Sequence, residues 1–310
     1  MKRRHKIVAT LACASAAASA LAGCTLPRVE VADLLQDTTV ADARAQRADA
    51  LSPVVAPPDL HEEGTLVVGI KSSAPAPMAA LGSDGELRGV DVDVAFALAD
   101  KLGLSEARFV TVTDAASGLA GGCDVVMGAT PDEPATVRVV APYSHAALGV
   151  FSKDAQRQAP ADATALAGRT VGVQAASASQ AALAALDLDF EQRTYPNLNE
   201  AFDALASGEV EVVVCDAGSG AFLGRSHEGV SFLGCVNEPA SRGIAVAAGS
   251  PLADAVSSAM SQLEADGIVG LVRGRWLGQL PELSDELLVT GLSPRATGDA
   301  AQAPDPAPES

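Results

Sequence analysis

The chain has 310 residues and carries 39 Asp and Glu against 21 Lys and Arg, which gives a formal net charge of −18 at pH 7. Nucleic acid and anionic lipid headgroups repel so acidic a chain, and we expect no nucleic-acid partner. Hydrophobic residues make up 48% of the chain, which is ample for packed cores, whereas aromatic residues make up 3%.

The first residues have the pattern of a secretory signal. Four Lys and Arg residues within the first six positions precede an apolar run at residues 7–22, which is rich in Ala and Ser. This run is shorter than the roughly 20 apolar residues that a membrane-spanning helix needs. We therefore predict that residues 1–23 are a signal peptide and that the mature chain has a net charge of −22.

The apolar run ends in Leu21-Ala22-Gly23-Cys24. This sequence resembles the lipobox of bacterial lipoproteins, in which the Cys receives a thioether-linked diacylglycerol and becomes the mature N-terminus. Acyl chains such as palmitate on Cys24 would hold the protein on a membrane, because each buried methylene contributes about 0.8 kcal/mol. The alternative is an ordinary signal cleaved near Ala22, with Cys24 left as a spare thiol.

Three further cysteines remain in the mature chain: Cys123, Cys215 and Cys235. Their spacing matches no zinc or redox motif, and we expect no metal and no cofactor. Cys215 and Cys235 could form a disulfide in an oxidising compartment. Each also lies beside an apolar run, where a buried free thiol is the commoner state.

The mature chain divides into a tether, a core and a tail. Residues 24–63 mix charged residues with Ala and end near Pro57 and Pro58, so we predict a tether. Residues 291–310 are rich in Pro, Ala and Asp and lack apolar periodicity, which predicts a disordered tail. The core of about 225 residues is long enough for two lobes of about 100 residues each.

Short β-branched runs alternate with Ala- and Leu-rich segments through this core. The predicted strands lie at residues 66–70, 109–112, 124–127, 170–174, 210–215 and 243–247, and the predicted helices at 93–102, 178–186, 198–207 and 251–266. This alternation predicts an α/β fold with mainly parallel sheets. Ligands of such folds bind beyond the carboxyl ends of the strands, where we expect the functional residues.

Several segments of the core occur in the order found in family 3 extracellular solute-binding proteins. They are GTLVVG at 64–69, GELRGVDVDV at 85–94, CDVV at 123–126, TP at 130–131, APY at 141–143, LAGRTVGVQ at 166–174, YPN at 195–197, GEVEVVVCD at 208–216, GIAV at 243–246, DG at 266–267 and RWLG at 275–278. The resemblance covers about residues 64–278. The amino-acid-binding subunits of ABC importers belong to this family.

The resemblance implies a type II periplasmic-binding-protein fold with two lobes. Lobe 1 is expected at residues 64–147 and 246–285, and lobe 2 at 152–242. Two crossings, near residues 149–153 and 242–246, would form the hinge about which the lobes close on a ligand. The implied protein is a monomer that is lipid-anchored on the extracytoplasmic face of the cell membrane and delivers its ligand to an ABC permease.

Three positions match residues with which the family holds a ligand, and Gln174 beside them is a further candidate. Asp216 follows a predicted strand and matches the aspartate that pairs with an α-ammonium; the alternative is a helix N-cap. Ser177 and Ser179 follow the strand that ends at Gln174, where the family binds a carboxylate at a helix N-terminus. Simple helix capping is again the alternative for the two serines.

Other positions depart from the family. The arginine that clamps the ligand carboxylate closes a Thr-Pro-Glu-Arg turn, and here the turn that begins at Thr130 has Glu133 in that place. Arg138 or Arg242 could supply the missing cation, although a salt bridge outside the site is the commoner role. Met78 stands where the family has an aromatic ring.

These departures predict that the site binds standard α-amino acids poorly, because a desolvated carboxylate without a partner costs several kcal/mol. We interpret the chain as a binding protein that takes a small polar solute, an amino acid or a related amine, with Asp216 as the principal anchor. One alternative is a degenerate relative that serves as an envelope interaction or sensory module. Another is an enzyme that uses Glu133 as a general acid, but the sequence shows no nucleophile elbow or phosphate loop.

Overall fold

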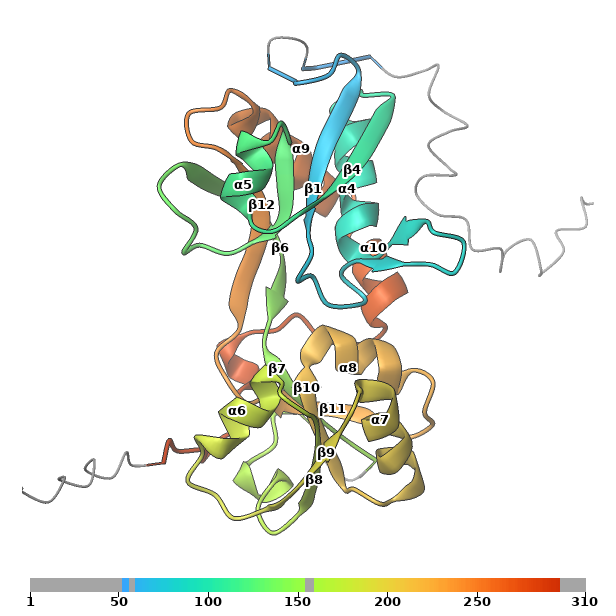
Figure 1. The fold of residues 1–310 in the computed structure, drawn as a ribbon, viewed down its shortest axis with the longest axis vertical. Coiled ribbons are helices and arrows are strands. Elements are labelled where there is room, and N and C mark those ends of the chain that lie inside the picture. Colours follow the sequence, from blue (N-terminus) through green and yellow to red (C-terminus); the bar gives the residue numbers. More distant parts are fainter. Residues whose placement is uncertain (1–51, 56–58, 154–158, 296–310) are drawn as a thin grey trace, which may run out of the picture. The chain divides into compact units, whose positions relative to one another are not determined.

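The computed structural model describes residues 52–55, 59–153 and 159–295 (Figure 1). All of them belong to one compact unit that begins at Val40. The predicted signal peptide, Cys24 and most of the predicted tether lie outside the described residues, as does the chain after Arg295. No helix in the described part of the chain combines the length and the apolar character needed to cross a membrane.

The first of two five-stranded sheets has the strand order β4-β1-β5-β12-β6. Its strands are β1 (Thr65–Lys71), β4 (Glu106–Val112), β5 (Val125–Ala129), β6 (Val137–Ala146) and β12 (Ala240–Ala247). β1 pairs in parallel with β4 and β5, whereas β12 pairs antiparallel with β5 and β6. Residues 65–70 of β1 are all buried, as expected for a central strand covered on both faces.

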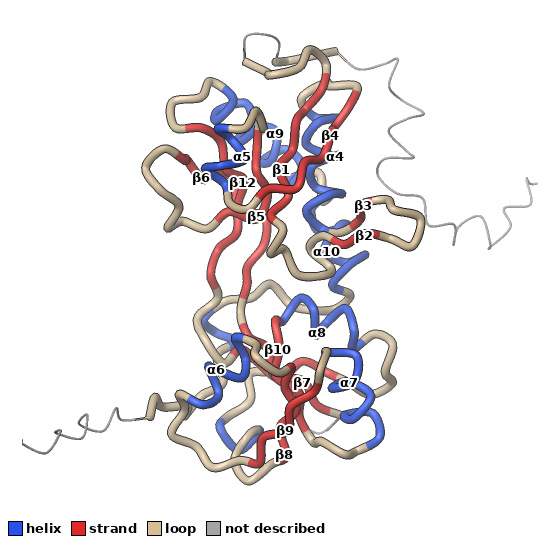
Figure 2. Tube along the Cα trace, viewed as in Figure 1, coloured by secondary structure: helices blue, strands red, loops and turns tan. Residues whose placement is uncertain are grey.

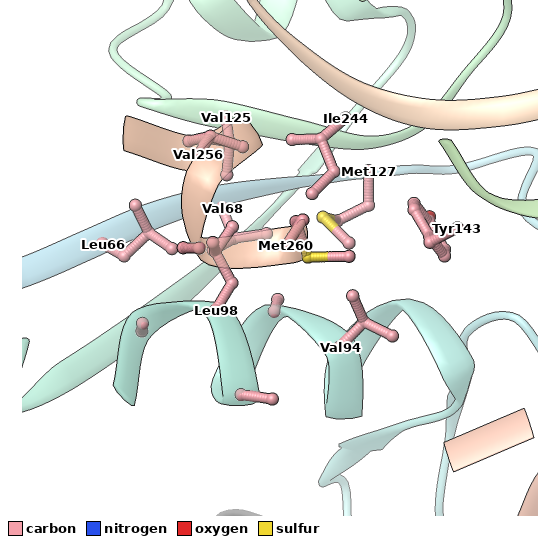
Figure 3. Packing of buried hydrophobic residues seen from close by; sticks show 14 of the residues in the cluster. Leu66, Val68, Val94, Leu98, Val125, Met127, Tyr143, Ile244, Val256 and Met260 are labelled. Carbon is pink, nitrogen blue, oxygen red and sulfur yellow. The ribbon is translucent and has the colours of Figure 1, made fainter. Parts of the chain in front are cut away.

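Helices cover both faces of this sheet, and together with the sheet we call them the first lobe. They are α4 (Val90–Lys101), α5 (Ala115–Ala120), α9 (Leu252–Ala265) and α10 (Ile268–Leu277), with a hairpin of β2 (Ala80–Leu81) and β3 (Leu87–Arg88) beside them. The main core packs Leu98 of α4 and Met260 of α9 against Val68, Met127 and Ile244 of the sheet (Figure 3). A smaller cluster lies under α5 on the opposite face.

The second sheet has the order β11-β7-β10-β8-β9. Its strands are β7 (Leu148–Ser152), β8 (Thr170–Gln174), β9 (Glu191–Tyr195), β10 (Val212–Asp216) and β11 (Ser231–Cys235), and its helices are α6 (Ala178–Ala184), α7 (Leu198–Ser207) and α8 (Ala217–Gly224). β8 runs parallel to β9 and β10, and β7 runs antiparallel to β10 and β11. Two apolar clusters form the core of this second lobe.

The chain passes between the sheets along a two-stranded ribbon (Figure 2). β6 leads directly into β7 through Ala147, and β12 returns beside β6, so the two neighbours are antiparallel. The register of the ribbon shifts after Arg242, and Ala141 on the opposite strand has a positive φ of 48°. The two predicted crossing segments instead lie largely within strands β7 and β12.

The end of the described chain returns to the second lobe. Leu283 packs against Ala147 and Cys235, and the backbone N–H of Val289 donates to the carbonyl of Cys235 at 2.8 Å. Residues 291–295 were predicted to begin a disordered tail, whereas the backbone N–H of Arg295 donates to the carbonyl of Ala185 at 2.7 Å. Residues 283–295 therefore extend the second lobe.

The predicted α/β architecture with two mainly parallel sheets is confirmed. Helix α7 and strand β8 have the predicted bounds, and most of the other predicted elements differ from the observed ones by one to three residues at each end. Cys123, Cys215 and Cys235 are buried free thiols. Burial raises the pKa of Cys235 to about 11 and that of Cys215 well above its ordinary value.

Candidate functional site

An ion pair lies at the carboxyl ends of the first-lobe strands. Lys71 is the last residue of β1, and its Nζ lies 3.6 Å from Oε1 of Glu133, in the turn that follows β5. The two side chains are 19% and 12% exposed. Glu133, the predicted substitute for the family arginine, therefore faces a cation. Lys71 was not among the predicted site residues, although it lies at the end of a strand, where functional residues were expected.

The other residues of this turn are held locally. A hydrogen bond from the Thr130 side chain lowers the pKa of the exposed Asp132. The backbone N–H of Glu133 donates to the carbonyl of Thr130 at 3.3 Å. Gly128, in β5 just before the turn, has a φ of +69°, and a Cβ at this position would lie 3.5 Å from Oδ2 of Asp91. The end of β5 thus lies close to a buried carboxyl group.

That carboxyl group belongs to Asp91, in the first turn of α4, which is 2% exposed. Tyr143 on β6 donates its hydroxyl hydrogen to Oδ1 of Asp91 at 2.6 Å. Burial raises the pKa of Asp91 to about 6, against the opposing effects of this hydrogen bond and of the nearby charges of Arg242 and Lys71. Two cations from different elements therefore surround one buried acid.

Asp216, at the end of β10, caps helix α8. Its Oδ1 accepts a hydrogen bond from the backbone N–H of Ser219 at 2.9 Å, so the capping role that was the alternative for Asp216 is present. The Ser219 hydroxyl lies 3.0 Å from this oxygen and 2.6 Å from the carbonyl oxygen of Ala76. Ala76 belongs to the first lobe, so Ser219 joins the two lobes beside Asp216.

The predicted serines lie after β8, at the start of α6. Ser177 is the N-cap and accepts from the backbone N–H of Gln180 at 3.2 Å, while its own hydroxyl donates to the carbonyl of Gln174 at 2.7 Å. Ser179 is 3% exposed. The neighbouring Ala176 has a positive φ of 54°, which is uncommon for a residue other than Gly. A ligand-binding role for these residues stays a prediction.

A small polar cavity lies between the two lobes. It measures about 20 Å³ and is lined by residues of both lobes, which include Met78, Ser144, His145, Asp216, Gly218 and Arg242. The structure thus brings two of the predicted residues, Met78 and Asp216, to one cavity with Arg242. Ser144 and His145 were not among the predicted ligand-binding residues. Met78 is 5% exposed and also belongs to the core of the first lobe.

The predicted residues do not all meet. In the described residues, no hydrogen bond or ion pair joins Glu133 or Asp216 to the residues near the start of α6, which are Gln174, Ser177 and Ser179. Arg138, one candidate for the missing cation, is 56% exposed and lies 4.0 Å from Asp254. Among the described His, Cys, Asp and Glu side chains, no group of three or more is placed to hold a metal ion.

The residues of the candidate site lie within a segment that matches a known protein family. The family model described as bacterial extracellular solute-binding proteins, family 3, matches residues 66–279. A search of curated proteins found no match.

Solved structures show the same fold. An ancestral cationic amino acid solute-binding protein is 24% identical, with a TM-score of 0.58 over 76% of this chain and 99% of that chain. A substrate-binding protein of a polar amino acid ABC uptake transporter from Streptococcus thermophilus is 17% identical, with a TM-score of 0.61 over 72% and 89% of the two chains. The second substrate-binding domain of GlnP from Lactococcus lactis, in an open conformation, is 17% identical, with a TM-score of 0.57 over 71% and 98%. The described residues therefore have the type II periplasmic-binding-protein fold.

Proposed function

Because the chain belongs to the bacterial extracellular solute-binding proteins of family 3, we propose that it is a lipid-anchored substrate-binding protein that captures a small polar solute for an ABC importer. The solute is an amino acid or a related amine. One observation carries the proposal: charged and polar side chains from both lobes, Asp216 and Arg242 among them, line one cavity between the lobes.

The charges of the site favour a ligand that carries both an ammonium and an acceptor group. Oδ1 of Asp216 accepts from Ser219, and the second carboxylate oxygen can accept from an ammonium. The guanidinium of Arg242 supplies donors on the first-lobe side of the same cavity. Glu133, which we considered as a general acid, faces Lys71, and the proposal includes no catalytic step.

The lipobox at residues 21–24 supports anchoring through Cys24 on the extracytoplasmic face of the membrane, with an ABC permease as the partner. A Cys24→Ala variant should appear in the soluble rather than the membrane fraction of cells, because it lacks the acylated thiol. A variant that stays fully membrane-bound would contradict the lipid anchor without affecting the proposal of solute binding.

A thermal-shift screen tests ligand capture. The mature Cys24→Ala chain would be heated with α-amino acids, amines, short peptides and organic acids, each at about 1 mM. A ligand present at about 100 times its Kd stabilises the folded state by about 2.7 kcal/mol, which is a readily measured rise in Tm. If no compound raises the Tm, the chain is instead an interaction or sensory module of the envelope.

A further inference from the structure

Arg242 and Ser144 are opposite each other in the antiparallel pairing of β12 and β6. Side chains of directly opposite residues emerge on the same face of a sheet, with Cβ atoms about 4.5–5.5 Å apart. The register shifts immediately after Arg242, at Gly243, where a Cβ would lie 2.7 Å from the carbonyl oxygen of Val140. Such irregularities turn side chains away from the direction of a regular strand. The guanidinium of Arg242 and the hydroxyl of Ser144 therefore emerge on the same face of the ribbon.

The hydroxyl of Ser144 needs a partner. Ser144 is 5% exposed, and its Oγ is a buried side-chain oxygen that makes no hydrogen bond to the described residues. Buried hydroxyl groups in native proteins are almost always hydrogen-bonded. Ser144 lines the small cavity between the lobes, so a group that enters this cavity is within reach of the hydroxyl.

Donors predominate among the side chains of this cavity. Arg242 lines the cavity, its charge also acts on Asp91, and its guanidinium carries five N–H donors. The facing acceptor is Asp216, one of whose oxygens is already bonded to Ser219. A volume of about 20 Å³ holds one water-sized group, which is the end of a ligand rather than a whole solute. A carboxylate oxygen satisfies both Ser144 and Arg242.

We propose that Arg242 and Ser144 form the carboxylate anchor of this binding site, so that the ligand is a zwitterionic α-amino acid whose ammonium pairs with Asp216. The inference rests on the proposed function and narrows its ligand class. Of the other cations, Arg138 is largely exposed and lies 4.0 Å from Asp254, and Lys71 faces Glu133. Arg273 also lines the cavity, but its guanidinium lies 3.6 Å from the carboxylate of Glu282. The anchor thus comes from the ribbon between the lobes instead of the turn after β5.

A second role for Arg242 has to be separated from this one. The charge of Arg242 also acts on the buried Asp91 and thereby favours its ionised form. An Arg242→Lys variant separates the two roles. A lysine keeps the positive charge that Asp91 requires, but lacks the planar fork that binds a carboxylate through two parallel hydrogen bonds.

Calorimetry with three matched pairs tests the anchor: L-lysine with cadaverine, L-histidine with histamine, and L-leucine with isoamylamine. Each pair differs in the α-carboxylate. The mature Cys24→Ala chain should bind at least one acid more than tenfold tighter than its amine. Arg242→Gln and Arg242→Lys should each weaken that acid at least tenfold and leave the amine within twofold. Arg138→Gln, an arginine of the same sheet, should change neither.

The variant Ser144→Ala gives an independent readout should Arg242→Gln fail to fold. It should weaken the acid about threefold or more and leave the amine unchanged. The anchor is overturned if the parent chain prefers the amine, or if the Arg242 and Ser144 variants weaken acid and amine equally or not at all. Binding of amines without binding of acids would overturn the anchor and leave the proposed function standing. Binding of no member of any pair, together with a negative thermal-shift screen, would overturn both.

Discussion

Lys71 Nζ lies 3.6 Å from Oε1 of Glu133, so the anion that occupies the family's arginine position faces a cation. Without a partner, Glu133 would repel the ligand carboxylate that the family arginine binds. Two like charges about 4 Å apart cost roughly 4 kcal/mol at an effective dielectric of 20, and an adjacent opposite charge offsets most of this cost. The ion pair thus removes the main electrostatic argument against a carboxylate ligand.

Neutralising either member of this pair should shift ligand preference in opposite directions. In Glu133→Gln, Lys71 loses its anion, and we expect carboxylate ligands to bind about fivefold tighter, in keeping with the order of 1 kcal/mol for a partly exposed pair. In Lys71→Gln, Glu133 is left alone, and the same ligands should bind about fivefold weaker. Titration calorimetry of both variants measures the shift.

The matched control for this experiment is Asp84→Asn, which breaks the exposed ion pair between Asp84, in the loop between β2 and β3, and Arg88 of β3. This variant should leave affinity unchanged. If Glu133→Gln and Lys71→Gln change affinity in the same direction, the pair acts on the structure of the turn rather than on ligand charge.

Asp216→Asn should separate the two roles of Asp216. Asn caps helices about as well as Asp, so the Tm should change little. The loss of the negative charge should weaken a ligand that carries an ammonium more than tenfold, since hydrogen bonds to charged groups contribute about 1.5–3 kcal/mol. Calorimetry together with a melting curve distinguishes the effects.

Asp162→Asn is the corresponding control, because Asp162 caps the short helix at residues 163–165 through the backbone N–H of Thr164 at 2.9 Å and does not line the ligand cavity. It should leave both quantities nearly unchanged. Unaltered ligand affinity in Asp216→Asn would restrict Asp216 to helix capping.

The buried carboxyl group of Asp91 should make stability depend on pH. Its pKa is about 6 in the folded protein, above the value of 3.8 for an ordinary Asp. The folded state therefore holds this proton more tightly than the unfolded chain, and the contribution of Asp91 to stability falls as the pH rises from about 4 to about 6. Well above pH 6 the contribution is constant, at about 3 kcal/mol less than well below pH 4.

Asp91→Asn removes this titration and keeps an acceptor for the hydroxyl of Tyr143. The free energy of unfolding of the variant, minus that of the parent chain, should rise between pH 4 and pH 6 and then level off. Urea unfolding at several pH values measures the difference and cancels the contributions of other acids. A difference that is flat over this range would contradict the assignment of the raised pKa to Asp91.

The regular elements of the fold could be predicted because their sequences follow one period. Helix α7 runs from Leu198 to Ser207 between an Asn cap and a Gly, both of which are strong end signals. Strand β9 has the sequence EQRTY at the edge of its sheet, where half-exposed polar residues carry no apolar pattern. Strand β6 contains Pro142, which is tolerated because β6 is also an edge strand. Pairing between distant segments, rather than local sequence, creates these strands.

The candidate site was predicted in part for a similar reason. Asp216 ends β10 and Glu133 lies in the turn after β5, and a family motif in the sequence marks each of them. Arg242 and Ser144 meet only through the pairing of β12 with β6, about 100 residues apart along the chain. Lys71 carries a local signal as the end of β1, but its partner Glu133 depends on the parallel pairing of β1 with β5.

The central claim is that a solute binds between the lobes and draws them together, and one distance tests it most directly. In the mature Cys24→Ala chain, spin labels on cysteines introduced at the exposed residues Ala80 of β2 and Ala184 of α6 report the separation of the lobes, while the three buried native thiols stay unlabelled. A saturating amount of the ligand that gives the largest thermal shift should shorten and narrow the distance distribution. A bound ligand that leaves the distribution unchanged would contradict capture by lobe closure.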